Sequence, residues 1–454
     1  MKCTLHNLGC KVNSYETEAM RQLLEAAGYE MVEFGSETAD VYIINTCTVT
    51  NIADRKSRQM LHKAKKDNPN AVVVAAGCYV QEAGEKLLAD EAVDIIVGNN
   101  RKGQIVEVLE EYFKGRNIDN SFIDINKTRE YENLEINASL AHTRAYIKIQ
   151  DGCNQFCTYC IIPFARGRVR SRKIEDIIDE VRKLAESGCH EIVVTGIHLS
   201  SYGLDFDNTE YNAQPVPNAE RLLQVLEAIA AVDGIDRIRL GSLEPRIITD
   251  TFLERLSAIP QICPHFHLSL QSGCDETLKR MNRRYDTEEF REGVEKIRRY
   301  FDKPAITTDV IVGFPGETDE EFAITRKYLE EINFFEMHVF KYSRRKGTIA
   351  DRMENQIADS VKSERSDALI ELDEELSRAY RESFAGSAEV VLVEEYVECD
   401  GIKYAVGHTK RYVKVYISLD CAQEQDIKIN AEIPVIITGI FGKDSVISKV
   451  AIAN

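Results

Sequence analysis

The chain has 454 residues, 44% of them hydrophobic, and a formal net charge of −18. This length suits about three globular domains, and the composition excludes a fibrous or disordered chain. The negative charge repels nucleic acids and membrane surfaces, so any nucleic-acid partner must be held by local basic patches. The sequence shows no signal peptide and no apolar run near the roughly 20 residues that span a bilayer. A cytoplasmic location without membrane contact is therefore expected, with the twelve cysteines serving as metal ligands or buried thiols.

Residues 1–118 alternate between short apolar strands and helices. Buried strands that alternate with helices are typical of a parallel, doubly wound sheet. The sequence predicts strands at 3–8, 41–45, 71–76 and 94–97, and helices at 14–27, 53–66, 80–88 and 104–113.

Three cysteines of this region, Cys10, Cys47 and Cys78, each follow the end of a predicted strand by one or two residues. Sites of such sheets form beyond the carboxyl ends of the strands, so the three thiols are expected to converge there as metal ligands. Small residues before Cys47 and Cys78 favour a close approach to a bound group. Separate buried thiols are the alternative, because free cysteine is among the most buried residue types.

A polar connector at 119–143 leads to a second region of strand–helix alternation, at 144–380. Six repeats of this unit predict a partial (β/α)6 barrel, with chemistry at the carboxyl ends of its strands. Strands are expected at 145–149, 191–195, 237–241, 265–270, 305–312 and 335–340, and helices at 174–186, 219–231, 249–257, 287–300 and 319–330.

Cys153, Cys157 and Cys160 follow the first of these strands at intervals of four and three residues. Three thiolates without an obvious fourth ligand suit an iron–sulfur cluster with one open iron, since closed clusters and zinc sites prefer four protein ligands. An open iron that binds and reduces S-adenosylmethionine (SAM) is the basis of radical chemistry. A zinc site completed by a distant Cys or His is the alternative. The other cysteines are expected to be core or incidental thiols: Cys3, Cys189, Cys263, Cys274, Cys399 and Cys421.

Polar residues and glycines end the later strands of the predicted barrel. Their side chains suit contacts to a ribose or an amino acid, although strand-to-helix turns favour such residues in any case. The candidates for cofactor binding are Thr195, Gly196, Ser242, Glu244, Gln271 and Gly313.

Basic residues gather around the cysteine triplet. Between 144 and 173 there are seven of them against a single acid, Asp151. A solvated surface is the usual meaning of such a run, but its place beside the candidate site favours RNA contacts. Two further basic clusters, at 279–284 and 344–346, are candidates for the rim of the barrel. The RNA-binding candidates here are Arg166, Arg168, Arg170 and Arg172.

A charged helix at 358–383 precedes a tail, 381–454, of β-branched runs and turns. This pattern predicts a small, five-stranded, OB-like β-barrel. Lys410 and Arg411 adjoin Tyr412 and are candidates for pairing with and stacking on RNA. A barrel with only a structural role is the alternative.

Three segments, 8–18, 45–50 and 151–172, carry a resemblance to a known family. With them, the chain resembles the radical SAM methylthiotransferases along essentially its full length, and its tail resembles their RNA-binding TRAM domain. Gly9-Cys10-Lys11-Val12-Asn13 and the segment 162–172 are most similar to the branch that acts on N6-threonylcarbamoyladenosine at position 37 of tRNA. The branches that act on isopentenyladenosine-37 or on a ribosomal-protein aspartate remain alternatives. A non-catalytic iron–sulfur protein that binds RNA or transfers electrons is the alternative from another class.

The resemblance implies two [4Fe–4S] clusters, one on each group of three cysteines, and SAM as a further cofactor. The cluster on Cys153, Cys157 and Cys160 would cleave SAM to a radical that removes hydrogen from C2 of the adenine. The second cluster would deliver the sulfur, which a second SAM methylates. The implied partners are tRNA, an electron donor such as flavodoxin or ferredoxin, and a sulfur source. No catalytic residue beyond the cluster ligands is implied.

Overall fold

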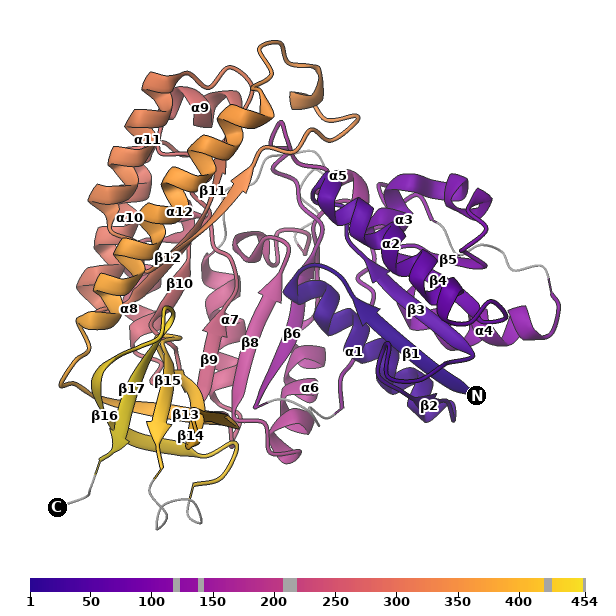
Figure 1. Cartoon of the computed structure of the whole chain (residues 1–454), viewed down its shortest axis with the longest axis horizontal. Coiled ribbons are helices and arrows are strands. Elements are labelled where there is room, and N and C mark those ends of the chain that lie inside the picture. Colours follow the sequence, from indigo (N-terminus) through magenta and orange to yellow (C-terminus); the bar gives the residue numbers. More distant parts are fainter. Residues whose placement is uncertain (117–122, 138–142, 207–218, 420–426, 452–454) are drawn as a thin grey trace.

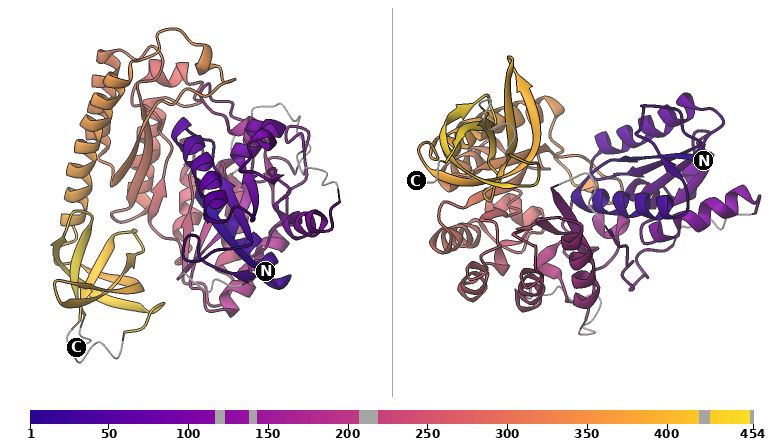
Figure 2. Two further views of the ribbon diagram at one scale, coloured as in Figure 1. Left: turned by 45° about the vertical axis from the view of Figure 1, so that its right-hand side comes forward. Right: turned by 90° about the horizontal axis from the view of Figure 1, so that it is seen from below.

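The structure is a computed structural model that describes residues 1–116, 123–137, 143–206, 219–419 and 427–451. The N-terminal sheet and the C-terminal barrel lie on opposite sides of a central domain (Figures 1 and 2). The α/β architecture with parallel sheets, expected from the sequence, is confirmed.

The N-terminal domain is a five-stranded parallel sheet of order β2-β1-β3-β4-β5. Helices α1 and α4 pack on one face and α2 on the other, which makes it doubly wound. The helix expected at 80–88 is instead two pieces, because Gly84 adopts a positive φ of 62° that ends α3. The elements are β1 (Lys2–Asn7), α1 (Lys11–Ala26), β2 (Glu30–Met31), β3 (Val41–Thr46), α2 (Asn51–Asp67), β4 (Val72–Gly77), α3 (Cys78–Ala83), the 3-10 helix η1 (Gly84–Ala89), β5 (Ile95–Val97), η2 (Lys102–Gln104) and α4 (Ile105–Phe113).

The central domain is an open barrel. One sheet has the order β7-β6-β8-β9 and the next β10-β11-β12, and parallel bridges at Ile238–Ile262 and Leu243–Leu268 connect them. Among the described residues no pairing joins β6 to β12, so the barrel has an open side. Its strands are β6 (Arg144–Asp151), β7 (Arg170–Ser171), β8 (Glu191–Gly196), β9 (Arg237–Leu240), β10 (His265–His267), β11 (Ala305–Val312) and β12 (Glu336–Lys341).

Helices cover the outer face of this barrel (Figure 1). Asp286 and Thr318 begin α10 and α11 with full capping boxes, which fixes where these two helices start. The helices are α5 (Ile162–Ala165), α6 (Ile174–Glu186), α7 (Ala219–Ala230), α8 (Asp250–Ser257), α9 (Asp275–Arg280), α10 (Thr287–Tyr300), α11 (Asp319–Ile332) and α12 (Asp359–Glu382), with short 3-10 turns η3 (Leu199–Ser201), η4 (Pro245–Ile247) and η5 (Ala350–Arg352).

Alternate residues of each strand point into the lumen of the barrel. Ile238, Phe266, Val310 and Met337 belong to the hydrophobic core beneath the helices. Their neighbours in sequence therefore face the opposite side, because successive side chains of a strand alternate. Most of these lumen positions are polar: Arg144, Lys148, Glu191, Arg237, Arg239, His265, His267, Thr307, Asp309, Glu336 and His338.

The C-terminal domain is a closed five-stranded barrel of order β13-β14-β15-β17-β16. Its hydrophobic core includes Ala305 and Phe335 of the central domain, so the two domains share buried contacts. None of the helices in the described ranges combines the length and apolar character that crossing a membrane requires. The strands are β13 (Ala388–Cys399), β14 (Ile402–Thr409), β15 (Lys414–Ser418), β16 (Glu432–Phe441) and β17 (Ser445–Val450).

Candidate active site

The local cysteine triplet lies in the loop after β6, at the carboxyl end of the barrel. Gly152 allows this loop to turn: its φ is +70°, and a Cβ there would lie 1.8 Å from the carbonyl oxygen of Arg168. Burial, together with the charge of nearby Cys157, raises the pKa of Cys153 to about 12, which reflects how close the two thiols lie. All three cysteines line one cavity of about 130 Å³.

Glu244 is the buried carboxylate of this cavity. It accepts hydrogen bonds from Gln155 Nε2 (3.1 Å) and from Arg246, and its Oε2 lies 3.1 Å from His198 Nε2. Burial alone would raise the pKa of Glu244, but His198 and Arg246 lower it to about 2. The cavity therefore contains a fixed negative charge that can accept hydrogen bonds from hydroxyl or ammonium groups.

Arg283 provides a positive charge on the same cavity. Its Nη1 lies 3.2 Å from Cys157 Sγ, Nη2 donates to the Ser269 carbonyl (3.2 Å), and Nε donates to Tyr285 Oη (2.9 Å). These contacts hold the guanidinium in place beside a cysteine of the triplet.

Three of the six candidates for cofactor binding line the cavity: Ser242, Glu244 and Gln271. Gly196 packs against Gln150, and a Cβ on Gly313 would clash with Lys362, so these glycines serve close packing. Contacts of SAM with Thr195, Gly196 and Gly313 stay predictions.

Sequence reasoning missed Gln155 and His198 and placed Arg283 only at the rim of the barrel. His198 follows the end of β8 by two residues, which is the signal that would have indicated it. Gln155 lies within the triplet itself, between its first two cysteines.

The second group of cysteines converges as the sequence predicts. Cys10, Cys47 and Cys78 follow β1, β3 and β4, which are neighbours in the sheet. A Cβ on Gly9 would lie 3.1 Å from Cys47 Sγ, so only glycine, with its φ of +119°, fits there comfortably. Burial raises the pKa of Cys47 to about 12, with Cys78 and Cys10 adding to the effect. The fold therefore gathers three thiols at one edge, and their role as ligands stays a prediction.

A buried ion network ties this edge to the barrel. Arg166 donates to Glu16 Oε1 (2.8 Å) and to Asp151 (3.2 Å), and its charge also acts on the thiol of Cys10. Lys148 Nζ contacts the same Glu16 carboxylate (2.9 Å). Burial alone would raise the pKa of Glu16, but these cations and Lys102 hold it well below its usual range. The network fixes the N-terminal domain against the barrel through charges.

The expectation that the basic run binds RNA needs correction for three of its members. Arg166 and Arg170 are 0% exposed and Arg172 is 1% exposed, so phosphates do not reach their side chains. Arg170 lies 3.6 Å from Asp151, and Arg172 forms an ion pair with Glu180. These cations neutralise buried carboxylates. Arg168 differs: it is half-buried and lies 4.2 Å from the centroid of the Phe156 ring.

Lys410 and Arg411 are half-buried and also contact protein, and their role in RNA binding stays a prediction. Lys410 Nζ donates to the Pro260 carbonyl (3.0 Å), and Arg411 donates to the Asp302 carbonyl (3.0 Å) and to Glu389 (3.1 Å). Their loop joins the two domains.

Tyr412, in the same loop, reaches the amino-terminal end of the central barrel. Its hydroxyl accepts from Arg144 Nη1 (3.0 Å), Arg239 lies 4.7 Å from its ring centroid, and the His265 ring lies 5.4 Å away. The residue adopts a φ of +65°, unusual for a residue other than glycine. This loop therefore closes the floor of the lumen.

Some members of the two other basic clusters form ion pairs. Arg345 binds Asp54 Oδ2 (2.6 Å) of the N-terminal domain, and Arg280 pairs with Glu321. Of the remaining cysteines, Cys3, Cys189, Cys263 and Cys274 are buried and Cys399 is half-buried, while Cys421 lies outside the described residues.

The open barrel with three cysteines at its carboxyl end defines a radical SAM enzyme. Residues 147–329 match the Radical SAM superfamily, and residues 2–98 match a family described as uncharacterized protein family UPF0004. The solved structure of the radical SAM methyltransferase TsrM from Kitasatospora setae shares the fold, with a TM-score of 0.56 and 15% identity, covering 77% of this chain and 76% of that one.

Relatives with higher sequence identity indicate which radical SAM enzymes this chain is similar to. The threonylcarbamoyladenosine tRNA methylthiotransferase MtaB of Bacillus subtilis is 43% identical over 90% of this chain and 89% of its own length. The MtaB of Aquifex aeolicus is 39% identical over 87% of this chain and 93% of its own length. A tRNA-2-methylthio-N(6)-dimethylallyladenosine synthase of the same organism is 36% identical over 87% and 88%. The chain belongs to the radical SAM methylthiotransferase family.

The cofactors of this family are [4Fe–4S] clusters and SAM, and the residues present fit them. The loop after β6 and the edge of the N-terminal sheet each hold three cysteines, and three protein ligands leave one iron of a [4Fe–4S] cluster open. The first group adjoins a cavity with one fixed carboxylate and one guanidinium, the charges that complement the ammonium and carboxylate of an amino acid.

Proposed function

We propose that this protein transfers a methylthio group to C2 of N6-threonylcarbamoyladenosine at position 37 of tRNA. The observation that carries the proposal is the pairing of two convergent cysteine groups with 43% identity, over 90% of the chain, to a relative named for this reaction. The alternatives act on isopentenyladenosine-37 or on a ribosomal-protein aspartate. A non-catalytic iron–sulfur protein would lack SAM cleavage altogether.

In this proposal Cys153, Cys157 and Cys160 hold the cluster that binds SAM, and the second group of three cysteines holds the sulfur-carrying cluster. When bound, these cofactors supply a 5′-deoxyadenosyl radical and a methylthio group. The aromatic C2–H has no acid–base route to substitution, so the protein contributes positioning and the exclusion of water. Glu244 and Arg283 orient SAM in the cavity, one through its ammonium or hydroxyl groups and the other through its carboxylate.

The C-terminal barrel serves in the proposal as a TRAM-like, OB-like domain that contacts tRNA. Lys410 and Arg411 also contact the central domain, so in the proposal other parts of this barrel and Arg168 add to the contacts with tRNA. An electron donor such as flavodoxin or ferredoxin and a sulfur source complete the set of partners.

The first test uses tRNA from a strain that lacks the gene. Nucleosides from digested bulk tRNA are quantified by mass spectrometry. Loss of 2-methylthio-N6-threonylcarbamoyladenosine, with its unthiolated precursor accumulating, is the expected result. Persistence of that nucleoside would contradict the assignment, and loss of the methylthio isopentenyl nucleoside would favour the first alternative.

The second test separates the two cysteine groups in vitro under anaerobic conditions. Cys157→Ala should abolish formation of 5′-deoxyadenosine from SAM. Cys47→Ala should retain this cleavage but form no methylthiolated tRNA. Cys399→Ala, a half-buried thiol of the C-terminal barrel, is the matched control and should retain both activities. Cleavage that survives in Cys157→Ala would overturn the role of the triplet.

A further inference from the structure

Three ionisable side chains that belong to neither cysteine group meet inside the barrel. His267, Asp309 and His338 lie on the neighbouring strands β10, β11 and β12, and one ligand atom of each lies within 4.8 Å of the others. His267 Nε2 is 3.2 Å from Asp309 Oδ2, and its Nδ1 is 3.0 Å from the hydroxyl of Thr307. We call the three side chains the lumen cluster.

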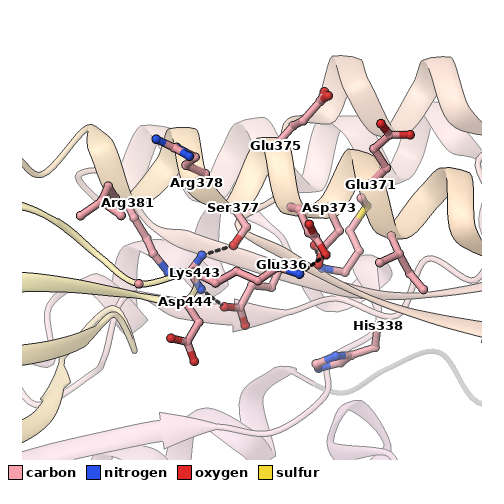
Figure 3. A pocket seen from close by; sticks show the side chains of 15 residues that line it. Glu336, His338, Glu371, Asp373, Glu375, Ser377, Arg378, Arg381, Lys443 and Asp444 are labelled. Atoms are coloured by element: carbon pink, nitrogen blue, oxygen red, sulfur yellow. Dashed lines mark hydrogen bonds and ion pairs between the residues drawn. The ribbon is translucent and has the colours of Figure 1, made fainter. Parts of the chain in front are cut away.

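The lumen cluster faces the interior of the barrel. Phe266, Val310 and Met337, the adjacent residues on each strand, lie in the core beneath the helices. His338 is exposed and also lines a larger cavity that it shares with acidic side chains of α12 (Figure 3). The rings of His267 and His338 are 5.9 Å apart and nearly parallel, at 25°. A group entering the lumen therefore meets both imidazoles and the carboxylate together.

The cluster presents mixed hydrogen-bonding chemistry. Partial desolvation lowers the pKa of His338, so this imidazole is neutral at pH 7 and can both donate and accept. Burial would raise the pKa of Asp309, but His267 holds it below its ordinary value, so it accepts as a carboxylate. The Arg283 charge beside Cys157 also acts on Asp309, which links the cluster to the cavity of the cysteine triplet.

Lys11 adds a cation to the same space. It begins α1 directly after Cys10, and its charge acts on His265 and on His338. No hydrogen bond or ion pair occupies Lys11 Nζ among the residues that the structure describes. Arg144 and Arg239, the other nearby cations, are instead paired with Glu191. Asp309 and Glu191 act on the Lys11 charge from a distance, but no carboxylate of the described chain forms an ion pair with it, so Lys11 offers the lumen a cation that a ligand can contact directly.

We propose that the lumen cluster and Lys11 bind the threonylcarbamoyl group of the substrate; this inference rests on the proposed function. That group carries a carboxylate, a hydroxyl, a carbonyl and two N–H groups. Lys11 pairs with the carboxylate, Asp309 accepts from an N–H or the hydroxyl, and the imidazoles bond the remaining polar atoms. An isopentenyl group offers no polar atoms and would leave these side chains unpaired, which is how a polar site rejects an apolar analogue. The cluster therefore sets the choice between the two tRNA substrates.

The test compares three anticodon stem-loops with the cluster-loaded enzyme under anaerobic conditions. One carries N6-threonylcarbamoyladenosine as the free acid, one carries its methyl ester, and one carries unmodified adenosine. Affinity is measured by fluorescence anisotropy and kcat/KM by mass spectrometry of the product. The wild type should prefer the acid over the ester by about 10- to 100-fold, the range of a charge-assisted hydrogen bond.

Lys11→Met should remove the preference for the acid over the ester. Its control is Lys2→Met, an exposed lysine of the same domain that should keep the preference. His338→Phe should weaken binding of acid and ester alike by about tenfold, while His62→Phe, at an exposed histidine, should not. The iron content of every variant is measured. If Lys11→Met incorporates too little iron, the result for His338→Phe decides the test, because His338 is remote in sequence from every cysteine.

The outcomes separate the two proposals. If the wild type forms no methylthiolated product from the acid substrate, the proposed function is wrong. If the wild type forms product but Lys11→Met and His338→Phe behave like their controls, the substrate site is wrong. Stoichiometric binding of Zn²⁺ or Mn²⁺ that His338→Phe abolishes would also overturn it, because two histidines and a carboxylate would then form a metal site.

Discussion

Glu16→Gln tests whether the buried ion network holds the N-terminal domain on the barrel. The Glu16 carboxylate contacts Lys102, Lys148 Nζ at 2.9 Å, and Arg166 at 2.8 and 3.0 Å. Glutamine keeps the shape but removes the charge and turns one acceptor into a donor that faces these cations. Asp151 then remains as the carboxylate that both Lys148 and Arg166 contact.

Glu16→Gln should lower the stability of the protein, because the buried cations around position 16 lose one carboxylate. Removing one partner from a buried ion network costs about 3–5 kcal/mol, because the remaining charges stay desolvated without compensation. The matched control is Glu110→Gln, which breaks an exposed i,i+4 pair with Lys114 and should cost about 0.3–0.5 kcal/mol.

Urea unfolding of the metal-free proteins, followed by circular dichroism under reducing conditions, measures this loss. Because the chain has several domains, the first transition is compared between variants instead of a single global free energy. A loss below about 1 kcal/mol for Glu16→Gln would refute the reasoning, since it would show that solvent or rearranged side chains compensate the cations.

Three further predictions concern other parts of the molecule. Tyr412→Ala removes the ring from the floor of the lumen and should destabilise the docked C-terminal barrel by about 3 kcal/mol in thermal unfolding, whereas Ile429→Ala, on the surface, should change little. Burial raises the pKa of Asp373 to about 6, so the wild type should lose about 1–2 kcal/mol of stability as pH rises from 4 to 7. Asp373→Asn should lack this dependence in urea titrations, and an unchanged pH profile would contradict the assignment. Arg283→Met should lower 5′-deoxyadenosine formation at least tenfold with iron content retained, since the cation beside Cys157 is lost; equal rates would exclude its role.

Much of the fold could be predicted because its elements carry local signals. The expected bounds of α6, α10 and β11 agree with the structure to the residue, since an amphipathic period or a buried β-branched run defines each of them. The helix expected at 80–88 was wrong because its period continues through Gly84, whose positive φ breaks the helix. The spacing of apolar residues does not indicate the backbone conformation of a single residue.

Some residues of the candidate site could also be predicted from the sequence, and others could not. The triplet at 153–160 is a local pattern, and the second group of cysteines could be predicted because parallel strands end at one edge. The basic run was misread because the fold buries it against carboxylates: Glu16 lies 150 residues from Arg166, and Asp151 and Glu180 are nearer in sequence but are brought into contact only by the folded structure. Local charge counts do not show which carboxylates the fold brings to each cation. His267, Asp309 and His338 escaped notice for the same reason, since each lies on a different strand.

The docked loop of Tyr412 affects how mutational scans of this tail should be interpreted. Alanine at Lys410 or Arg411 would weaken the contact between the tail and the central domain, because both side chains bind backbone carbonyls there. Such a variant would retain less tRNA even if neither residue ever touched a phosphate. If such a variant binds tRNA more weakly in a gel-shift assay, the cause can be a lost fixed orientation between the two domains. Thermal unfolding of the same variant distinguishes this cause from a lost RNA contact, because only the first lowers the melting temperature.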